Sequence, residues 1–383
     1  MRKFTSYFLL LASLIFVMSN KAHAQIHCEI DTLASANKEA LYAPYKSLDY
    51  SSYSFCVNLY VHVIRKSDGT GGQSVSDVYQ ALSYLDASYN PHNIYFKWNH
   101  QIDYIDDTYR YERPSKKVFL TNNHSDGIDI YLFDDSAELN IATGGGSSDE
   151  PKTAVFVTGY FVDNNSVVIP LVKSHVLSHE VGHVLFLWHT HHGTGENTDD
   201  PNECPELVNG SNSATCGDYI TDTPADPNMY YNVDLSTCQW LGSGTDINGD
   251  SYDPDEHNIM AYTQPKCMKY FTPEQSKRMK NAMANIAQLQ LVSNYTSYGY
   301  PCATVGLNYY PNAADDELNL DLREKPANTY TYQLYNYYGV LVLSGESTNV
   351  LKTIDTSTLD EGLYFLHFYE NGELIVKQLV IEH

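Results

Sequence analysis

The sequence feature that most constrains the fold is the stretch HEVGHVLFLWHTHHG at residues 179–193. His179 and His183 stand four residues apart, so on an α-helix their rings lie on one face, one turn from each other. The residues around them are apolar and would bury one side of such a helix: Val176, Leu177, Val181, Val184 and Leu185. We therefore predict a half-buried helix over residues 173–187, with two imidazoles directed at one place.

This spacing of histidines is what a tetrahedral zinc ion needs. Glu180 adjoins the first ligand and can reach a water molecule on the metal as a general base, and His189 would supply the third imidazole. The plain alternative is a surface helix in which this histidine and glutamate motif occurs by chance. The apolar flanks argue against it, because half-buried histidines need polar partners. His191 and His192 are expected in solvent or beside the ligands, not on the metal.

The N-terminus predicts export. Arg2 and Lys3 precede the apolar run from Phe8 to Met18, and the small-residue sequence AHA then stands before Gln25, which is typical of a secretory signal over residues 1–24. Neither this run nor any later stretch is long enough to span a bilayer, so we expect a soluble protein outside the cytoplasm. The formal net charge of −24 makes nucleic acid and anionic membranes poor partners.

Two folded units of unequal size are expected for a chain of 383 residues. Residues 25–55 show no sustained periodicity and are assigned to a pro-segment or N-terminal arm, and residues 56–303 to an α/β (α+β) domain. In this domain alternation predicts a strand at 57–65, and helical spacing predicts a helix at 74–90. Further short strands are predicted at 93–99, 127–133, 153–159 and 166–172.

The second half of the chain changes character twice. Residues 188–257 are rich in Gly, Asn, Asp and Pro and predict a long irregular segment, which is usually functional or held by a metal or disulfides. A helix over 272–290, with Thr272 as its N-cap, closes the domain. Short alternating runs punctuated by Gly and Asn then predict a small all-β sandwich over residues 304–383.

Residues 55–290 resemble the metzincin metalloproteases, and within them the pappalysin-like (cytophagalysin) family. The zinc ligands and the glutamate of the family motif are all matched, at His179, Glu180, His183 and His189. Two further blocks resemble the family in the same order: GDYITDTPA at 217–225 and NIMAYTQPKCMKYFTPEQSKRM at 258–279. The resemblance implies a zinc-binding active-site helix above a Met-turn.

The resemblance also implies roles for two residues outside the helix. Met260 is at the position of the Met-turn methionine, which packs beneath the metal without binding it. Tyr262 is at the position of a phenol that hydrogen-bonds the oxyanion, although ordinary packing is the plain alternative for one of 33 tyrosines. The implied reaction is peptide hydrolysis by zinc-activated water, with Glu180 taking the water proton and passing it to the leaving amine.

Phe186 is the main departure from the family, which has a glycine at this position. The glycine lets the backbone turn sharply between the helix and the third ligand. A phenylalanine forced to a positive φ would be strained by roughly 1–3 kcal/mol, which is small beside the free energy of zinc binding. We therefore expect an adjusted turn and a retained His189.

Seven cysteines lie in the exported part of the chain, so disulfides are permitted and one thiol is left over. Two pairs are suggested, one by resemblance to a family disulfide beside the Met-turn and one to hold the irregular segment: Cys238 with Cys267, and Cys204 with Cys216. Two alternatives stay open for the rest. Cys28 is either a latency thiol that ligates the zinc of a zymogen, with Cys56 bonded to Cys302, or it is bonded to Cys56.

Calcium (Ca2+) is the second cofactor considered beside zinc (Zn2+), because some relatives bind it in the loop after the zinc helix. Acidic residues of this chain fall there, at Asp199, Asp200, Asp218 and Asp222. A second group has the spacing of the start of a calcium loop without its final glutamate: Asp246, Asn248 and Asp250. An acidic, solvated loop is the plain alternative.

The C-terminal unit carries a series of short motifs: Tyr310-Pro311-Asn312, Asn336-Tyr337-Tyr338-Gly339, Leu359 to Tyr364, and Lys377. In this order they resemble the C-terminal sorting domain of the type IX secretion system of Bacteroidetes. The resemblance implies that the secretion machinery is a partner, and that the protein crosses the periplasm to the medium or the cell surface. A generic β-sandwich that binds substrate or glycan is the alternative.

Together these features predict a secreted, monomeric zinc-dependent endopeptidase that acts on proteins or peptides. A rival of another class is a catalytically lapsed, zinc-containing cell-surface adhesin or binding protein, of which Phe186 would be the first sign. A zinc peptidase with a downstream carboxylate as third ligand is disfavoured, because His189 lies at metzincin spacing.

Overall fold

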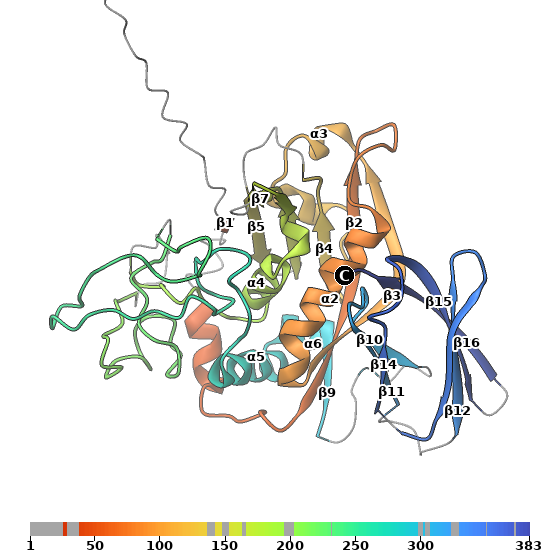
Figure 1. The fold of residues 1–383 in the computed structure, drawn as a ribbon. Coiled ribbons are helices and arrows are strands. Elements are labelled where there is room, and N and C mark those ends of the chain that lie inside the picture. The colour runs from red at the N-terminus through yellow and green to blue at the C-terminus, as the bar shows by residue number, and fades with distance from the viewer. Residues whose placement is uncertain are drawn as a thin grey trace, which may run out of the picture.

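The computed structural model describes residues 26–28, 38–135, 142–147, 153–162, 166–194, 203–230, 232–297, 302, 307–322, 329–349, 351–370 and 373–383. The predicted secretory signal lies outside these residues. A central sheet with helices on it lies between an irregular segment on one side and a small β-sandwich on the other (Figure 1). The predicted combination of an α/β sheet domain with a C-terminal all-β unit is confirmed at this level.

The central sheet has the strand order β1-β5-β6-β4-β2-β3, with β9 also paired to β2. Its strands are β1 (Ile26–Cys28), β2 (Ser54–Arg65), β3 (Ile94–Asp106), β4 (Ile128–Leu132), β5 (Ala142–Ser147), β6 (Ala154–Thr158) and β9 (Ser293–Thr296). The pairs β2–β3, β2–β4 and β4–β6 are parallel, whereas β5 and β9 run antiparallel to β6 and β2. Strands β7 (Tyr160–Val162) and β8 (Val168–Pro170) form a separate hairpin.

The two faces of the sheet are covered differently. Helices α2 (Val75–Tyr89) and α4 (Val176–Val184) pack on one face, where Val61 of β2 joins Leu82 and Leu177 in the main core. Because side chains alternate along a strand, His62 and Ile64 point to the opposite face, where a smaller core contains Ile64. Further helices are η1 (Ala43–Tyr45), η2 (Asn90–His92), α3 (Thr108–Tyr111), η3 (Lys116–Leu120), η5 (Leu171–Lys173), α5 (Pro273–Asn285) and α6 (Ala287–Val292), and residues 38–42 are helical as well.

Two helices start where the sequence predicts, but two predicted helix lengths are wrong. Ser74 caps α2 and Thr272 caps α5, each through a reciprocal capping box. The prediction of one helix over 272–290 is wrong, because the chain is extended at Ile286 before α6 begins. This break turns α6 so that its apolar residues join the main core. The helix predicted over 173–187 is also shorter, since η5 precedes α4.

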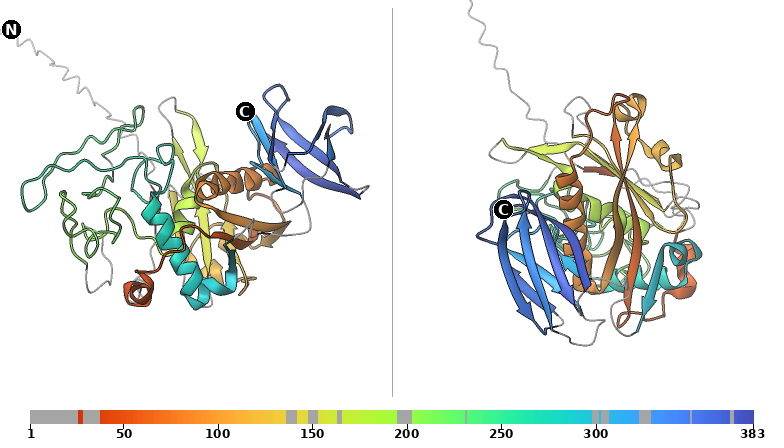
Figure 2. Two further views of the ribbon diagram at one scale, coloured as in Figure 1. Left: turned by 90° about the horizontal axis from the view of Figure 1, so that it is seen from below. Right: turned by 90° about the vertical axis from the view of Figure 1, so that its right-hand side faces the viewer.

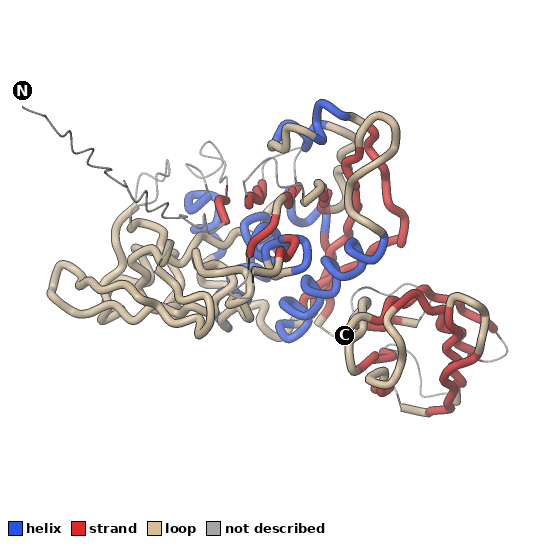
Figure 3. The backbone as a smooth tube through the Cα atoms, turned by 45° about the horizontal axis from the view of Figure 1, so that its top comes forward, coloured by secondary structure: helices blue, strands red, loops and turns tan. Residues whose placement is uncertain are grey.

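Residues 188–257 are irregular, as predicted. In the described parts of this range there is no helix or strand, only isolated bridges such as Val233 with Trp240. The segment forms the long loop region in Figure 3, beside the sheet domain. The irregular segment is stabilised by two disulfides, Cys204–Cys216 and Cys238–Cys267, instead of by backbone hydrogen bonds between strands.

The C-terminal unit is a sandwich of two antiparallel sheets (Figure 2). One sheet contains β10 (Asn308–Tyr310), β11 (Glu317–Asp321) and β14 (Leu351–Asp355); the other contains β12 (Tyr330–Asn336), β13 (Leu341–Ser347), β15 (Gly362–Glu370) and β16 (Glu373–Ile381). The sandwich has its own core and contacts α2, where Tyr79 packs against Ala313 and Val380. Among the described residues, no helix is long and apolar enough to cross a membrane.

Candidate metal centre

Three histidine rings converge at one end of α4. The Nε2 atoms lie 3.2 Å apart for His179 and His183, 3.1 Å for His179 and His189, and 3.0 Å for His183 and His189. Four-coordinate zinc with bonds of about 2.0–2.1 Å holds its nitrogen ligands roughly 3.3 Å apart, so the cluster has the size that zinc needs. All three side chains are buried, so solvent water does not compete for their nitrogen atoms.

The far nitrogens of the helical histidines are fixed by backbone carbonyls. Nδ1 of His179 lies 2.6 Å from the Ile259 oxygen, and Nδ1 of His183 lies 2.9 Å from the Leu187 oxygen. An Nδ1–H that donates to a carbonyl leaves Nε2 with a lone pair directed at the common point. Burial, together with the neighbouring His189 and His179, lowers the pKa of His183 well below its ordinary value. The cluster therefore favours neutral imidazoles, the form that binds a metal.

Phe186 adopts the left-handed conformation itself, with φ of 78°. The Leu187 N–H donates to the Gly182 oxygen (2.9 Å) and the Phe186 N–H to the His183 oxygen (3.1 Å), which is the Schellman arrangement. The expectation of an adjusted turn is therefore wrong: the turn keeps the geometry that a glycine would have. The ring is buried in the main core, and this packing offsets a conformational cost of roughly 1–3 kcal/mol.

The N-terminal arm braces this turn from behind. Lys38 Nζ donates to the Leu187 oxygen at 2.7 Å, and Trp188 Nε1 donates to Glu39 Oε1 at 2.7 Å. Glu39 also pairs with the buried Arg278 of α5. Although burial acts to raise it, the Arg278 guanidinium holds the pKa of Glu39 below its ordinary value. The arm is thus packed against the segment that joins the second histidine to the third.

A turn at residues 258–261 lies beneath α4. Met260 is fully buried, and a Cβ atom on Gly182 would lie only 2.6 Å from the Met260 sulfur. Asn258 fixes the turn: its Oδ1 accepts the Met260 N–H at 2.9 Å, and its amide pairs with that of Gln275 on α5. The Thr190 N–H donates to the Met260 oxygen at 3.2 Å. The turn therefore connects α4, α5 and the chain beside His189.

Glu180 and Tyr262 lie next to the histidine cluster. Glu180 follows His179 on α4 and is fully buried. The Tyr262 ring is half-buried, and its centroid lies 4.4 Å from that of His189 and 6.4 Å from that of His179. The fold thus places a buried carboxylate next to His179 on the helix and a phenol ring close to His189.

His191 and His192 are both buried, so of the two placements expected for them, in solvent or beside the ligands, the structure shows the second. The His191 ring stacks on that of His189, with centroids 4.9 Å apart and an interplanar angle of 11°. His192 stacks on Trp188 at 4.1 Å. Both rings therefore pack beside the third histidine, and Tyr219, further along the irregular segment, also contacts His192.

Three disulfides form among the residues that the structure describes: Cys56–Cys302, Cys204–Cys216 and Cys238–Cys267. The first of these excludes the alternative in which Cys28 is bonded to Cys56. Cys28 ends β1, whose parallel pairing with β5 sets it opposite Gly144 at the edge of the sheet. Its role as a latency thiol stays a prediction.

Two of the carboxylates considered for calcium, Asp222 and Asp246, accept hydrogen bonds from the protein itself. Asp222 accepts from Thr272 Oγ1 at 2.6 Å and from the Glu274 N–H at 3.0 Å, so it serves the start of α5. Asp246 accepts backbone N–H groups of Val208, Asn248 and Asp250, and these hydrogen bonds close the loop. Asp199 and Asp200 lie outside the described residues.

A different acidic group is buried in the irregular segment, formed by Glu206, Asp218 and Asp226. Burial, with the charges of Asp218 and Asp226, raises the pKa of Glu206 to about 8, and burial raises that of Asp218 to about 7. Thr190 Oγ1 donates to Asp226 Oδ2 at 2.5 Å, which connects this group to the residue after His189. Sequence reasoning named only Asp218, because no spacing rule relates the other two.

Residues 116–284 match the peptidase M43 family, described as pregnancy-associated plasma protein-A, and residues 308–382 match a secretion system C-terminal sorting domain. An extracellular metalloprotease of Colletotrichum graminicola is 26% identical over 236 residues, covering 58% of this chain and 74% of that protein. One of Podospora anserina is 24% identical over 265 residues, covering 63% and 77%. Human pappalysin-1 is 29% identical over 161 residues, covering 39% of this chain and 9% of its own length.

These matches and the fold define the class: the chain carries a peptidase M43 (pappalysin) domain followed by a type IX sorting domain. It is homologous to pappalysin-1 and to extracellular metalloproteases. The sheet domain is consistent with the metzincin type of catalytic domain. The protein is a secreted zinc metalloendopeptidase, as its sequence predicts.

Proposed function

We propose that this secreted enzyme cleaves peptide bonds within proteins or peptides, with His179, His183 and His189 as the zinc ligands and Glu180 as the general base. The observation that carries this proposal is the convergence of three buried Nε2 atoms within 3.2 Å of one another beside a buried glutamate. A lapsed peptidase would not need to keep the carboxylate and the phenol next to the histidines.

When bound, zinc supplies Lewis acidity that polarises the scissile carbonyl and acidifies a water molecule. Glu180 accepts the proton of the attacking water and delivers it to the leaving amine, in a buried site that strengthens its effect. Tyr262 donates its phenol hydrogen to the developing oxyanion. The sulfur of Met260, in the role of a Met-turn methionine, supports the helix under the ligands through its contact with Gly182.

A direct test uses the purified full chain, a peptide library and mass-spectrometric detection of products. Activity should be lost on zinc chelation and restored by zinc. The Glu180→Gln variant should lose about 100-fold to 10,000-fold in turnover while it keeps its zinc, because only the proton transfer is removed. An adhesin would bind zinc and cleave no member of the library, with or without the substitution.

The domain assignment is proposed as 25–55 for the pro-segment or arm, 56–303 for the catalytic unit and 304–383 for the sorting unit. Within the first range, the contacts of Lys38 and Glu39 suggest that cleavage of the pro-segment occurs before residue 38. Cys28 would then leave with the removed piece. Parallel pairing of β1 with β5 supports latency, because it occupies an edge strand that a substrate could otherwise pair with.

Latency is tested by comparing freshly purified full chain with its Cys28→Ser variant. The unaltered chain should become active only after N-terminal processing, whereas the variant should cleave peptides at once. Equal initial rates for the two proteins would argue against a latency thiol.

The sorting unit is proposed to deliver the enzyme to the secretion machinery without taking part in hydrolysis. Its core is separate from that of the sheet domain, which it contacts at α2, β3 and η5. Deletion of residues 307–383 should trap active enzyme in the cell envelope. A truncated protein found in the medium at normal levels would refute the sorting role.

Calcium, if it is required, is proposed to bind Glu206, Asp218 and Asp226. Three buried carboxylates repel one another, and a divalent cation relieves both the repulsion and the cost of burial. Through Asp226 and Thr190 the ion would also steady the chain beside His189. Calcium-dependent thermal stability that disappears in Glu206→Gln is the expected signature.

A further inference from the structure

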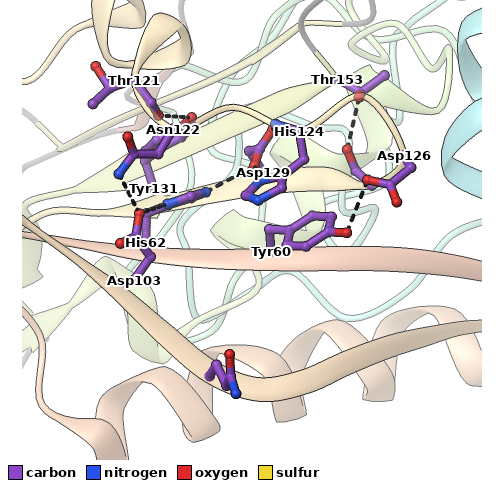
Figure 4. Close-up of polar contacts among 12 residues, drawn as sticks. Tyr60, His62, Asp103, Thr121, Asn122, His124, Asp126, Asp129, Tyr131 and Thr153 are labelled. Carbon is purple, nitrogen blue, oxygen red and sulfur yellow. Dashed lines mark hydrogen bonds and ion pairs between the residues drawn. The ribbon is translucent and has the colours of Figure 1, made fainter.

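A second group of metal-binding side chains lies on the opposite face of the central sheet from α4. His62 comes from β2 and Asp129 from β4, while His124 comes from the loop between η3 and β4 (Figure 4). One ligand atom of each residue lies within 4.8 Å of the other two. His62 and Asp129 are fully buried, whereas the His124 side chain is 36% exposed. This group shares no residue with the cluster at α4.

The hydrogen-bonding atoms of these side chains are directed at one carboxylate oxygen. His62 Nε2 lies 2.9 Å from Asp129 Oδ1, and His124 Nδ1 lies 2.7 Å from the same oxygen. The other oxygen, Asp129 Oδ2, accepts the backbone N–H of His124 at 2.8 Å. Asp129 Oδ1 is therefore the point at which both rings meet.

The surroundings fix the orientation of each ring. Asp103 Oδ2 lies 2.8 Å from His62 Nδ1 and is itself held by Asn122 Nδ2 at 2.8 Å. The His124 ring stacks on Tyr60, with centroids 3.5 Å apart and an interplanar angle of 5°. A carboxylate on the far nitrogen of a histidine is the usual support of a metal-binding imidazole, because it fixes the tautomer and raises the basicity of the ligating nitrogen.

Hydrogen-bond accounting favours a cation at this place. Both nitrogens of His62 face carboxylate oxygens, at 2.8 and 2.9 Å, although a neutral imidazole has only one N–H to donate. With Nδ1–H given to Asp103, the lone pair of Nε2 would face the lone pairs of Asp129. A metal ion between Nε2, the Asp129 oxygen and His124 removes this conflict and balances two carboxylate charges.

The cavity beside the group has a volume of about 450 Å³ and is lined in part by His62, Asp103 and His124. Three protein ligands leave coordination positions open, and a cavity of this size has room for water or an external ligand to complete them. Two imidazoles with one carboxylate suit zinc and other first-row divalent metals, whereas calcium and magnesium prefer oxygen ligands alone.

We propose that His62, His124 and Asp129 form a second binding site for a divalent transition metal, with zinc as the metal expected in this protein. The ion fastens the loop at residues 121–127 to the two central strands. The site is independent of the peptidase centre, because it lies across the sheet and uses none of the ligands on α4.

The test is metal stoichiometry in the full chain, stripped with a chelator and titrated with Co2+ followed by its visible spectrum, and separately with Zn2+ measured by mass spectrometry. His124→Phe keeps the ring that stacks on Tyr60 and removes the ligand atom, and Asp129→Asn keeps the shape of the carboxylate. His367→Phe, in the sorting unit, is the matched control. His183→Phe removes a proposed ligand of the peptidase centre.

Each site should bind one equivalent. His124→Phe and Asp129→Asn should each lose one equivalent of metal, and His367→Phe should lose none. His183→Phe should lose the equivalent bound at α4 and keep the one that His124→Phe loses. Circular dichroism verifies that the variants are folded. If neither substitution at the second site changes the stoichiometry, the group is a hydrogen-bonded network with a doubly protonated His62, and the inference is wrong. Loss in His124→Phe without loss in His183→Phe would instead support the second site and contradict the proposed zinc ligands at α4.

Discussion

The two histidine groups of this protein are assembled in opposite ways. At α4, the first and third histidines are ten residues apart, and one helix with its C-terminal turn brings the rings together. On the other face of the sheet, His62 and Asp129 are 67 residues apart, and only strand pairing makes them neighbours. A short motif therefore identifies the first group in the sequence and cannot identify the second.

The local group nevertheless depends on distant residues. Phe186 holds its left-handed turn because its ring is buried and because Arg278 Nε donates to its carbonyl oxygen at 2.7 Å. Glu39 neutralises Arg278 and holds Trp188. In the second group, His62 and Asp129 lie on paired neighbouring strands, and His124 comes from the loop that precedes β4. The helix motif specifies the ligands, and long-range packing sets the position of the third.

The largest expected difference between the two groups is in activity. His183→Phe should lower kcat/KM by about 1,000-fold or more, because the metal supplies several kcal/mol of transition-state stabilisation. His367→Phe, far from both groups, is the matched control and should leave kcat/KM within about twofold. Assay of both proteins with one library peptide decides this. Normal activity in the His183→Phe variant would mean that the histidine group at α4 is not the catalytic one.

The support of the turn can be broken at Glu39. Glu39→Gln should lower the free energy of unfolding by about 3–5 kcal/mol, because Arg278 is left buried without its counter-charge. Glu274→Gln is the control, since its ion pair with Lys277 is partly exposed and contributes about 1 kcal/mol or less. Urea unfolding of both variants measures the difference. Similar losses for the two would mean that the arm does not stabilise the turn.

The strain at Phe186 can be separated from the packing of its ring. Phe186→Gly and Phe186→Ala both lose the ring, but only alanine keeps a Cβ at positive φ. The glycine variant should therefore be more stable than the alanine variant by about 1–2 kcal/mol. In the exposed part of α2 the order should reverse, with Ala87→Gly costing about 1 kcal/mol. Thermal unfolding gives both differences, and an alanine variant as stable as glycine would contradict the strained turn.

The smallest expected effect concerns carboxylates that differ in their partners. Asp129 faces two histidines, whereas Glu206 and Asp218 are buried near other carboxylates. The pKa values of Glu206 and Asp218 are raised in the folded chain, to about 8 and about 7. The folded state therefore keeps protons that the unfolded state releases at about pH 4. With calcium removed, stability should therefore fall as pH rises from about 5 to about 8.

This pH effect is measured by urea unfolding in a chelating buffer. Glu206→Gln should flatten the slope because the amide does not titrate, and added calcium should reduce it in the unaltered chain. A slope that is the same in Glu206→Gln would assign the pH dependence to other groups, such as the partly buried Asp86, whose pKa is also raised by desolvation to about 7.

The sequence by itself determined the features that depend on near neighbours. These include the helix that carries His179 and His183, the caps at Ser74 and Thr272, the alternation of β2 and the irregular character of residues 188–257. Each follows from spacing within one turn, one strand or one capping box, so a short window of residues is sufficient. The same reasoning fails at Ile286, where burial of α6 against the core overrides continuous helical spacing.

Only the tertiary structure decided the features that depend on partners far along the chain. Whether Phe186 would bend the turn or adopt it depended on Arg278, 92 residues away, and on the core around the ring. The burial of His191 and His192 depended on rings further along the chain, Tyr262 beside His191 and Tyr219 beside His192. The meeting of His62, His124 and Asp129 depended on the order of strands in the sheet. The physical reason is the same in each case: long-range contacts are set by topology and packing, which no local spacing encodes.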